Sequence, residues 1–530
     1  MNTATVLYLI SILTTFIGSA MLVCIPVGWR MHDPVPLVAE FAVCAVTAVV
    51  IGLTGIFATR KRHADSGKAG IREGFATVAF GWLAALIFAS LPFLFVARMY
   101  PADALFETVS GLTTTGASVI VPNLPRWNGT VFPNGVESLP HCVQFWRCLI
   151  SWLGGMGIVV FALVILPFLG IGATQLYNAE VPGVKMNSDQ LTPRIAGTAK
   201  LVWGTYVVLT ALQTGCLTLG GMPLFDAVCH SFSTVSTCGF STKQASIAAY
   251  PNPFIQWTFI VFLLLGACNF TLFFKAVLTR RRLIYFQDAE FRFFLATVVA
   301  SSLIIATVLR LTYPETIQSM TGAAEPNCWL TSLRYAAFQV SSIISTGGFS
   351  TADYLQWPTQ ALLILFLLTL LGGCTGSTAG GLKCVRVLLL CKHVLSELRR
   401  CLFPRAIPDI RLNGERIQAA TINKTLAFVV LYLGIIAATA FLLPFLSKMD
   451  FITALTASAT CIGNVGPGFG AVGPAGSYAW MSTPAKVLLS FAMILGRLEI
   501  YTLLVVFMTS FWKRGKKHLT FRRCTDILLR

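Results

Sequence analysis

The stretch Thr113-Thr114-Thr115-Gly116-Ala117 decides the fold, because three related stretches recur later in the chain. With one glycine of each in register, they are Ser236-Thr237-Cys238-Gly239-Phe240, Ser345-Thr346-Gly347-Gly348-Phe349 and Thr460-Cys461-Ile462-Gly463-Asn464. The agreement extends upstream of the aligned glycine. Thirteen residues before it stand Asp103, Asp226, Tyr335 and Asp450, and six residues before it stand Ser110, Ser233, Ser342 and Ala457. One such stretch is weak evidence, but four at matching offsets indicate an internal repeat.

The chain around these stretches is apolar enough to lie in a membrane. Of its 530 residues, 55 % are hydrophobic and 11 % are charged, and the mean hydropathy is +0.75. Because one span needs about 20 apolar residues, this composition excludes a soluble enzyme and predicts a polytopic membrane protein. The predicted spans are 5–28, 36–59, 74–97, 144–170, 201–221, 254–278, 292–312, 360–390, 425–446 and 485–512. We expect the first to be a retained helix rather than a signal peptide, since no basic residue precedes it.

The net charge of +18 gathers at alternate ends of these spans. The basic clusters are Arg60 to Arg62, Arg280 to Arg282, Lys392 to Arg416 and Lys513 to Arg523. The positive-inside rule therefore places 60–73, 171–200, 279–291, 391–424 and the tail after 512 on the cytoplasmic side. This pattern argues against nucleic-acid binding and allows attraction to anionic membrane lipid. The 15 cysteines show no CxxC pair or metal-ligand spacing, so we interpret them as small buried hydrophobic residues.

Each copy of the repeat lies between two spans, in a segment too short to cross the membrane. An aspartate is a favoured helix N-cap, so we interpret Asp103, Asp226 and Asp450 as caps of short pore helices rather than as ion ligands. Non-helical backbone at membrane depth must be buried in protein or line a water-filled cavity. Four such turns satisfy that rule by meeting on one axis, where carbonyl oxygens replace the hydration shell of a cation. Glycine permits the positive φ this needs, and oxygen ligands without a carboxylate suit a monovalent ion.

With these repeats in place, the chain resembles the Trk/Ktr/HKT superfamily of potassium transporters. Its two extra N-terminal helices resemble the bacterial TrkH branch. Five further groups of residues carry the resemblance: Phe145-Trp146-Arg147 with Trp152 to Ile158, Ala179 to Gly183 with Leu191 to Arg194, Gly372 to Lys383, Gly463 to Gly468, and Gly496 to Ile500. The resemblance covers essentially the whole chain, with the motifs in the expected order.

The resemblance implies an all-α polytopic protein of the bacterial inner membrane that takes up K⁺ through a channel-like pore and has no organic cofactor. It implies a homodimer with one pore per subunit, regulated by a cytosolic RCK/TrkA-type ring of nucleotide-binding subunits. The implied selectivity filter comprises Thr114, Thr115, Gly116, Thr237, Cys238, Gly239, Thr346, Gly347, Gly348, Cys461, Ile462 and Gly463. The expected units are 1–73 for the extra helices, then 74–200, 201–291, 292–424 and 425–530 for the four repeats. Two positions depart from the pattern: Cys461 replaces a threonine, and Tyr335 replaces a capping aspartate.

A glycine-rich run interrupts the predicted span 360–390. It contains no Gly-Lys-Ser/Thr after a strand, so a phosphate-binding loop is disfavoured, whereas close packing of small residues remains an alternative. The resemblance implies an intramembrane loop that obstructs the pore beneath the filter. Arg497, near the middle of the last span, is a functional candidate by default, either holding this loop or only satisfying loop carbonyls. The implied gate residues are Gly372, Gly373, Gly376, Ser377, Thr378, Gly380, Gly381, Lys383 and Arg497.

Two other functions compete with K⁺ uptake. The first is a Na⁺-conducting relative or a Na⁺- or H⁺-coupled K⁺ symporter; a glycine in all four filter copies argues against a Na⁺-preferring relative, whereas the sequence leaves H⁺ or Na⁺ coupling of K⁺ uptake open. The second is a membrane-embedded enzyme, but the sequence has no HExxH and no paired intramembrane aspartates. We interpret His230, in the second pore helix, as a packed histidine rather than a proton relay.

Overall fold

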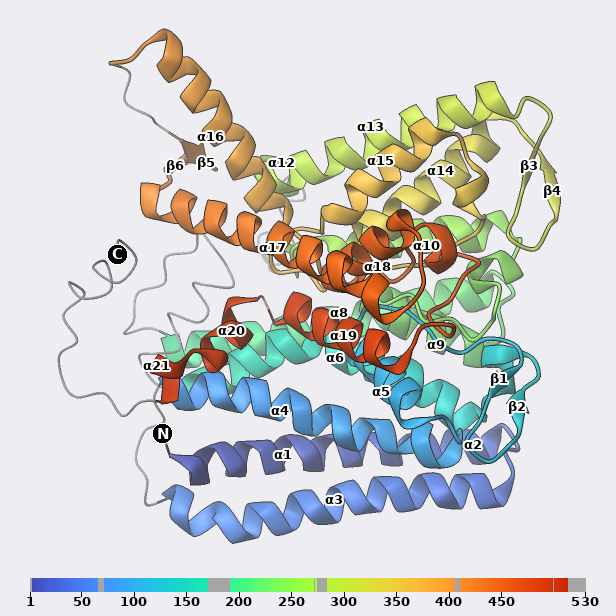
Figure 1. The fold of residues 1–530 in the computed structure, drawn as a ribbon, viewed down its shortest axis with the longest axis vertical. Coiled ribbons are helices and arrows are strands. Elements are labelled where there is room, and N and C mark those ends of the chain that lie inside the picture. The colour runs from blue at the N-terminus through green and yellow to red at the C-terminus, as the bar shows by residue number, and fades with distance from the viewer. Residues whose placement is uncertain are drawn as a thin grey trace.

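The computed structural model describes residues 2–64, 71–169, 191–270, 272–273, 284–405, 410–498 and 500–512. Within these ranges most of the chain is helical, and the strands form only three short hairpins (Figure 1). These are β1 (Leu124–Pro125) with β2 (Val131–Phe132), β3 (Thr316–Gln318) with β4 (Ala324–Pro326), and β5 (Arg411–Leu412) with β6 (Glu415–Arg416). The all-α class is confirmed. The basic residues 280–282, the tail from 513 and the motif 179–183 lie outside the described residues.

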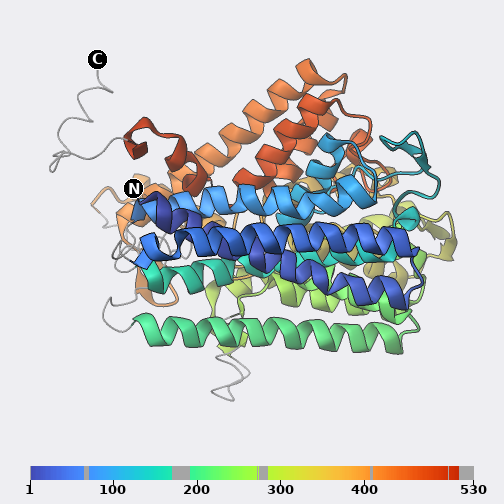
Figure 2. The ribbon, with the colours of Figure 1, turned by 90° about the horizontal axis from the view of Figure 1, so that it is seen from below.

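The N-terminal helices form one edge of the molecule (Figures 1 and 2). They are α1 (Thr3–Leu22), α2 (Cys24–Arg30) and α3 (Val35–Ala64). Small residues let α1 and α3 approach closely, because a Cβ on Gly18 would lie 2.7 Å from the Val49 nitrogen. On the other side α1 packs against α4 (Ile71–Leu91), which continues as a π-helix at Pro92–Val96.

Four units of helix, short pore helix and helix make up the rest. The pore helices are α5 (Pro101–Leu112), α9 (Leu224–Val235), α14 (Trp329–Ile344) and α18 (Phe451–Gly463). The flanking helices are α4 with α6 (His141–Leu169), α8 (Leu191–Leu219) with α10 (Pro253–Ala267), α13 (Ala289–Thr312) with α15 (Thr359–Leu370), and α17 (Ala419–Leu446) with α19 (Thr483–Arg497). The remaining α-helices are α12 (Ile284–Gln287), α16 (Cys384–Leu402), α20 (Tyr501–Phe507) and α21 (Thr509–Trp512), and 3-10 turns lie at Gly135–Ser138, Ser246–Ala249, Tyr354–Gln356 and Gly470–Val472.

Six described helical segments are long and apolar enough to cross a membrane: Thr3–Arg30, Val35–Lys61, Arg72–Val96, Val202–Leu219, Ala289–Thr312 and Ala419–Leu446. The second helix of three units is shorter because the chain leaves the helix within the membrane. The span expected over 360–390 divides into α15 and α16 around residues 371–383. The single span expected over 485–512 is wrong, because it divides into α19 and α20 at Ile500, which has a φ of +31°.

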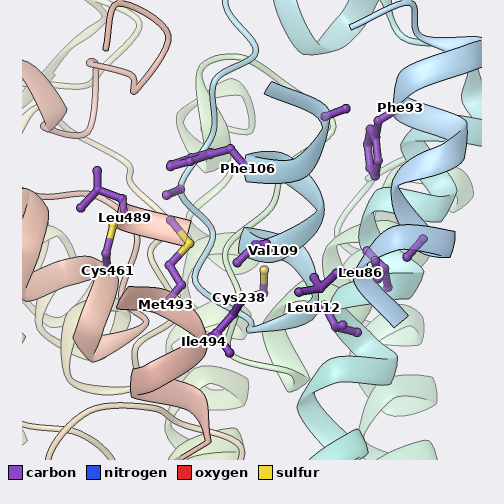
Figure 3. Packing of buried hydrophobic residues seen from close by; sticks show 14 of the residues in the cluster. Leu86, Phe93, Phe106, Val109, Leu112, Cys238, Cys461, Leu489, Met493 and Ile494 are labelled. Carbon is purple, nitrogen blue, oxygen red and sulfur yellow. The ribbon is translucent and has the colours of Figure 1, made fainter. Parts of the chain in front are cut away.

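The largest hydrophobic cluster surrounds the first pore helix (Figure 3). Phe106 and Val109 of α5 lie between the π-helix that continues α4, which contributes Phe93, and α19, which contributes Met493. A short helix buried in this way needs no amphipathic surface of its own, since packing rather than length stabilises it. The cluster therefore places the C-terminal end of α5, just before the turn at Thr114, between packed neighbours.

Candidate ion pore

Each pore helix ends in the same backbone turn. A residue with a left-handed backbone conformation follows each helix. The φ values are +53° at Thr114, +56° at Thr237, +57° at Thr346 and +54° at Asn464. One residue separates the first three from their helices, whereas Asn464 follows α18 directly. The next N–H donates to a carbonyl five residues back, at 2.7–2.9 Å in all four turns: Thr115 to Ser110, Cys238 to Ser233, Gly347 to Ser342 and Val465 to Thr460. A glycine with positive φ then follows, at Gly116, Gly239, Gly348 and Gly466. Four segments distant in sequence thus share one geometry.

The register expected for the fourth repeat is wrong by three residues. Gly463 is the last residue of α18, and Cys461 and Ile462 are buried within that helix. Asn464 takes the left-handed position because asparagine tolerates that conformation, and Gly466 takes the position of the other three glycines. Cys461 is therefore a packing residue beside α19, as Figure 3 shows, and the residue that corresponds to the filter threonines is Asn464.

The four turns interlock in a closed ring. A Cβ added to Gly348 would lie 2.5 Å from the Val465 oxygen of the next repeat, and a Cβ on Gly466 would lie 2.5 Å from the Thr115 oxygen. A Cβ on Gly116 would lie still closer to the Cys238 carbonyl oxygen, and a Cβ on Gly239 still closer to the Gly347 carbonyl oxygen. The first repeat therefore contacts the second, the second the third, the third the fourth, and the fourth the first, so the contacts form a closed ring. A side chain at any of these positions would displace the carbonyl of the neighbouring repeat.

The ring opens into a cavity of about 350 Å³. All four glycines line it, together with polar residues that follow the turns, including Ser118, Ser241 and Ser350. Because the four repeats share this one cavity, they surround a common axis. The cavity therefore lies at one end of the ring.

The opposite end of the ring carries side-chain oxygens. Within the described part of the chain, Thr114 Oγ1 and Asn464 Oδ1 are buried and have no hydrogen-bond partner. Thr346 Oγ1 accepts from the Gly380 N–H at 2.8 Å, and Thr237 Oγ1 donates to Thr378 Oγ1 at 3.4 Å. Thr114 and Asn464 therefore present side-chain oxygens without a partner, whereas Thr237 and Thr346 contact the glycine-rich run at 372–383.

The aspartates do not all cap the pore helices. Asp450 is the N-cap of α18, accepting from the Thr453 N–H at 3.4 Å, and its capping role is confirmed. Asp103 and Asp226 lie inside the first turn instead, which corrects the expectation for both. Asp103 pairs with Lys486 of α19 at 2.6 Å, and Asp226 accepts from Thr242 and Tyr250. The three-residue error in the fourth repeat follows from aligning a cap with the third residue of the other helices, which lies three positions after their caps.

A buried ion pair near the first two turns was not predicted. Glu107 of α5 accepts from Arg147 Nε at 2.6 Å and from the Val119 N–H at 3.1 Å. Arg147 also donates to the Ser241 carbonyl at 3.0 Å, so it joins the segments that follow the first and second turns. The motif Phe145-Trp146-Arg147 contained the arginine, but its partners lie 40 and 94 residues away and have no local sequence signal.

His230 is packed, as expected. Its Nδ1 donates to the Asp226 carbonyl at 2.7 Å, so the neutral ring accepts at Nε2 from Ser241 Oγ at 2.9 Å. Its ring lies against Tyr250, Phe259 and Phe349.

Residues 371–383 form a compact non-helical loop inside the helical framework. Its base closes where the Gly372 N–H donates to the Leu382 carbonyl at 2.9 Å and the Cys384 N–H to the Gly373 carbonyl at 3.2 Å. Gly376 and Gly381 have φ of +76° and +67°. Lys383 donates to the Ala379 carbonyl, and Ser377 Oγ to the Cys374 carbonyl. With the contacts to Thr237 and Thr346, these bonds hold the loop against the inner end of the ring.

Arg497 anchors this loop from α19. It is buried, and its guanidinium donates to the Thr378 carbonyl at 2.8 Å and to the carbonyls of Gly154 and Gly155 in α6 at 3.2 and 3.3 Å. The expected contact between Arg497 and loop carbonyls is therefore present. Arg497 of the fourth repeat thus joins α6 of the first repeat to the loop of the third repeat.

Known proteins share this architecture. A family described as TrkH, cation transport protein, matches residues 46–514. The Trk system potassium uptake protein TrkH of Salmonella typhimurium is 39 % identical over 459 residues, covering 85 % of this chain and 88 % of the relative. The Trk system potassium uptake protein TrkG of Escherichia coli is 36 % identical, covering 83 % and 86 %. The crystal structure of the potassium transporter TrkH from Vibrio parahaemolyticus superposes with a TM-score of 0.82 at 32 % identity, covering 97 % of this chain and all of that one.

These matches bear on class and location. They confirm a transport protein rather than an enzyme, and a multi-pass protein of the inner membrane. The matched region includes all four turns, the loop and Arg497. This chain belongs to the TrkH family of cation transport proteins.

Proposed function

We propose that this protein takes up K⁺ through a channel-like pore whose selectivity filter is the ring of four turns. The closed ring of glycine and carbonyl contacts carries this proposal, because it brings backbone oxygens from all four repeats around one axis. The relatives from Salmonella typhimurium and Escherichia coli are Trk system potassium uptake proteins. Carbonyl oxygens held by such a framework replace the hydration shell of a monovalent cation.

The filter assigned here differs from the sequence prediction in one repeat only. It comprises Thr114 to Gly116, Thr237 to Gly239, Thr346 to Gly348, and Asn464 to Gly466. The unpartnered oxygens of Thr114 and Asn464 make side-chain ligands available at the inner end. An amide oxygen at the fourth position removes the difficulty that a Cys461 thiol posed there, since a hard cation prefers oxygen.

Replacing Gly348 by serine should reduce selectivity without unfolding the protein. Its φ of +67° lies close to the left-handed well, which a serine occupies at a cost of about 1–2 kcal/mol. The added Cβ displaces the Val465 carbonyl, 2.5 Å away, from the ring. We expect the ratio of ⁸⁶Rb⁺ to ²²Na⁺ uptake in proteoliposomes to fall about fivefold. The same replacement at Gly215, where a Cβ meets no atom within 4 Å, is the control. An unchanged ratio in Gly348→Ser would contradict the assignment.

The same isotope pair tests the alternative of Na⁺ conduction or coupling. A pure K⁺ pathway takes up ⁸⁶Rb⁺ without external Na⁺ and without a proton gradient. Strict dependence of ⁸⁶Rb⁺ uptake on either ion would establish a symporter instead.

We propose that the loop at 371–383 is the gate. It blocks the inner end of the filter through hydrogen bonds to Thr237 and Thr346, so opening must break those bonds. Breaking the bond from the Gly380 N–H frees the Thr346 hydroxyl oxygen at the ring's inner end. Closing the loop and coordinating an ion with the Thr346 hydroxyl therefore compete.

We further propose a homodimer regulated by a cytosolic ring of nucleotide-binding subunits. The cytoplasmic end of α16 is the candidate docking surface, because Arg399, Arg400 and Arg405 are exposed there. In Figure 1 this helix extends away from the rest of the molecule.

Neutralising Arg399, Arg400 and Arg405 to glutamine should weaken ring binding about tenfold at low salt, since exposed ion pairs contribute about 0.2–1 kcal/mol each. The difference should shrink as salt rises, because screening weakens these attractions. Affinity is measured with an RCK-type ring and the detergent-solubilised protein. The control is Arg310→Gln, because Arg310 lies in the last turn of α13 and not in the proposed docking surface. Equal affinities of the triple variant and the parent at low ionic strength would exclude this surface.

A further inference from the structure

A buried carboxylate holds both ends of the intramembrane loop. Glu290, in the first turn of α13, is 7 % exposed. Its Oε1 accepts from the Thr375 N–H at 2.7 Å, from Thr375 Oγ1 at 3.1 Å and from the Val385 N–H at 3.0 Å. Thr375 lies early in the loop, and Val385 lies in the first turn of α16. One oxygen atom therefore joins the two ends of the non-helical segment to a third element.

These donors would otherwise lie unpaired. The Val385 N–H belongs to the first turn of α16, where no carbonyl of the same helix can accept it. The Thr375 N–H lies in non-helical backbone buried inside the protein. An unpaired buried N–H is costly, so Glu290 favours the arrangement in which both donors reach it. Its three bonds supplement those of Arg497, which hold the opposite side of the loop at Thr378.

A cytoplasmic hairpin contacts the chain next to Glu290. The strands β5 and β6 are joined by Asn413 and Gly414, whose φ values of +49° and +85° make the two-residue turn that suits a hairpin. Asn413 accepts from the Ala289 N–H and donates to the Asp288 carboxylate, both at 2.8 Å. Lys392 of α16 also donates to the Arg411 carbonyl of the hairpin at 2.6 Å. Consecutive residues 288–290 therefore bond to the hairpin on one side and to the loop on the other.

We propose that Glu290 is the positioning residue that keeps the loop in its blocking position, and that the β5–β6 hairpin links this contact to the cytoplasmic face. The proposal rests on the loop being the gate. A protein that pulls on the hairpin moves the start of α13 and with it the oxygen that both ends of the loop share. Loosening that contact allows the loop to leave the filter.

Two buried cysteines report on the loop independently of ion flux. Cys374 and Cys384 are 2 % and 1 % exposed and lie at the loop and its end. We expect labelling of Cys374 by N-ethylmaleimide, followed by peptide mass spectrometry, to rise at least fivefold in Glu290→Ala. Glu290→Gln retains an acceptor oxygen and should label like the parent. Cys461, buried in α18, is the internal control and should stay unlabelled in every variant.

The hairpin is tested by Asn413→Gly, which preserves the turn and removes the side chain that contacts α13. We expect a smaller rise in Cys374 labelling than in Glu290→Ala. The matched control for Glu290→Ala is Glu73→Ala. Glu73 is also a glutamate in the first turn of its helix, but it accepts from the Asn2 N–H and not from the loop. No rise in Asn413→Gly would overturn the link to the hairpin.

Parallel ⁸⁶Rb⁺ uptake without a partner separates this inference from the gate proposal. Higher labelling and higher uptake in Glu290→Ala support both. Higher labelling with unchanged uptake supports the role of Glu290 and refutes the loop as the gate. Parental labelling in a folded Glu290→Ala protein, or equal labelling of the alanine and glutamine variants, overturns the role assigned to Glu290.

Discussion

Replacing Arg497 by alanine should open the pore, raising partner-independent ⁸⁶Rb⁺ uptake at least tenfold. The guanidinium makes three hydrogen bonds, one to the loop at Thr378 and two to α6. Bonds from a charged donor contribute about 1.5–3 kcal/mol each, whereas two functional conformations differ by a few kcal/mol. Losing the bond to the loop is therefore enough to change which conformation predominates. Deleting Gly376 to Gly380 should have the same effect.

Selectivity should stay at the parental value in both variants, because the ring of four turns is untouched. Lys486→Met is the control for removing a buried cation from the same helix, since Lys486 contacts Asp103 of α5 and not the loop. If the Arg497 and deletion variants fold and dimerise yet conduct no faster than the parent, residues 371–383 are a packing feature and the gate lies elsewhere.

Gly466→Ala should abolish most K⁺ preference, whereas Gly463→Ala should leave it intact. At Gly466 the φ of +95° is less accessible to an L side chain than that of Gly348, and a Cβ would lie 2.5 Å from the Thr115 oxygen. Strain of about 1–3 kcal/mol and this displaced carbonyl predict a loss of selectivity of about tenfold or more. At Gly463 the backbone is helical and the nearest atom to a Cβ is 3.3 Å away.

The ratio of Rb⁺ to Na⁺ permeability measured for the two variants side by side decides the register. Equal effects at the two positions would mean that the fourth repeat does not join the ring as the other three do. A larger effect at Gly463 would restore the register expected from the sequence.

Hydropathy was sufficient to predict the membrane class and most spans, because burial in lipid requires long apolar helices. Three of the four turns that follow the pore helices could also be placed, since a threonine and a glycine recur at the same offset from the pore helix. The fourth was misplaced because Asp450 lies just outside its helix, whereas Asp103 and Asp226 are the third residues of theirs. The run Asn464-Val465-Gly466 held the correct signal, an asparagine that tolerates positive φ followed by a glycine.

The contacts that hold the filter and loop could not be predicted from one sequence. Glu290 lies 85 residues from Thr375, and Lys486 lies 383 residues from Asp103. Periodicity reports only which face of a local helix is apolar, so it carries no information on which buried charges meet. Arg497 was found because an ionisable residue inside a span is costly enough to be noticed alone.

The most direct test of the account is the reversal potential of the Arg497→Ala protein in a planar bilayer with K⁺ on one side and Na⁺ on the other. A ring of four carbonyl-lined turns that opens when the loop is released predicts a current that reverses far toward the K⁺ equilibrium potential, and Gly466→Ala in the same background should move the reversal toward zero. A current that reverses near zero in the Arg497→Ala protein itself, or that keeps its K⁺ preference when Gly466 is replaced, would contradict the claim that this ring is the selectivity filter.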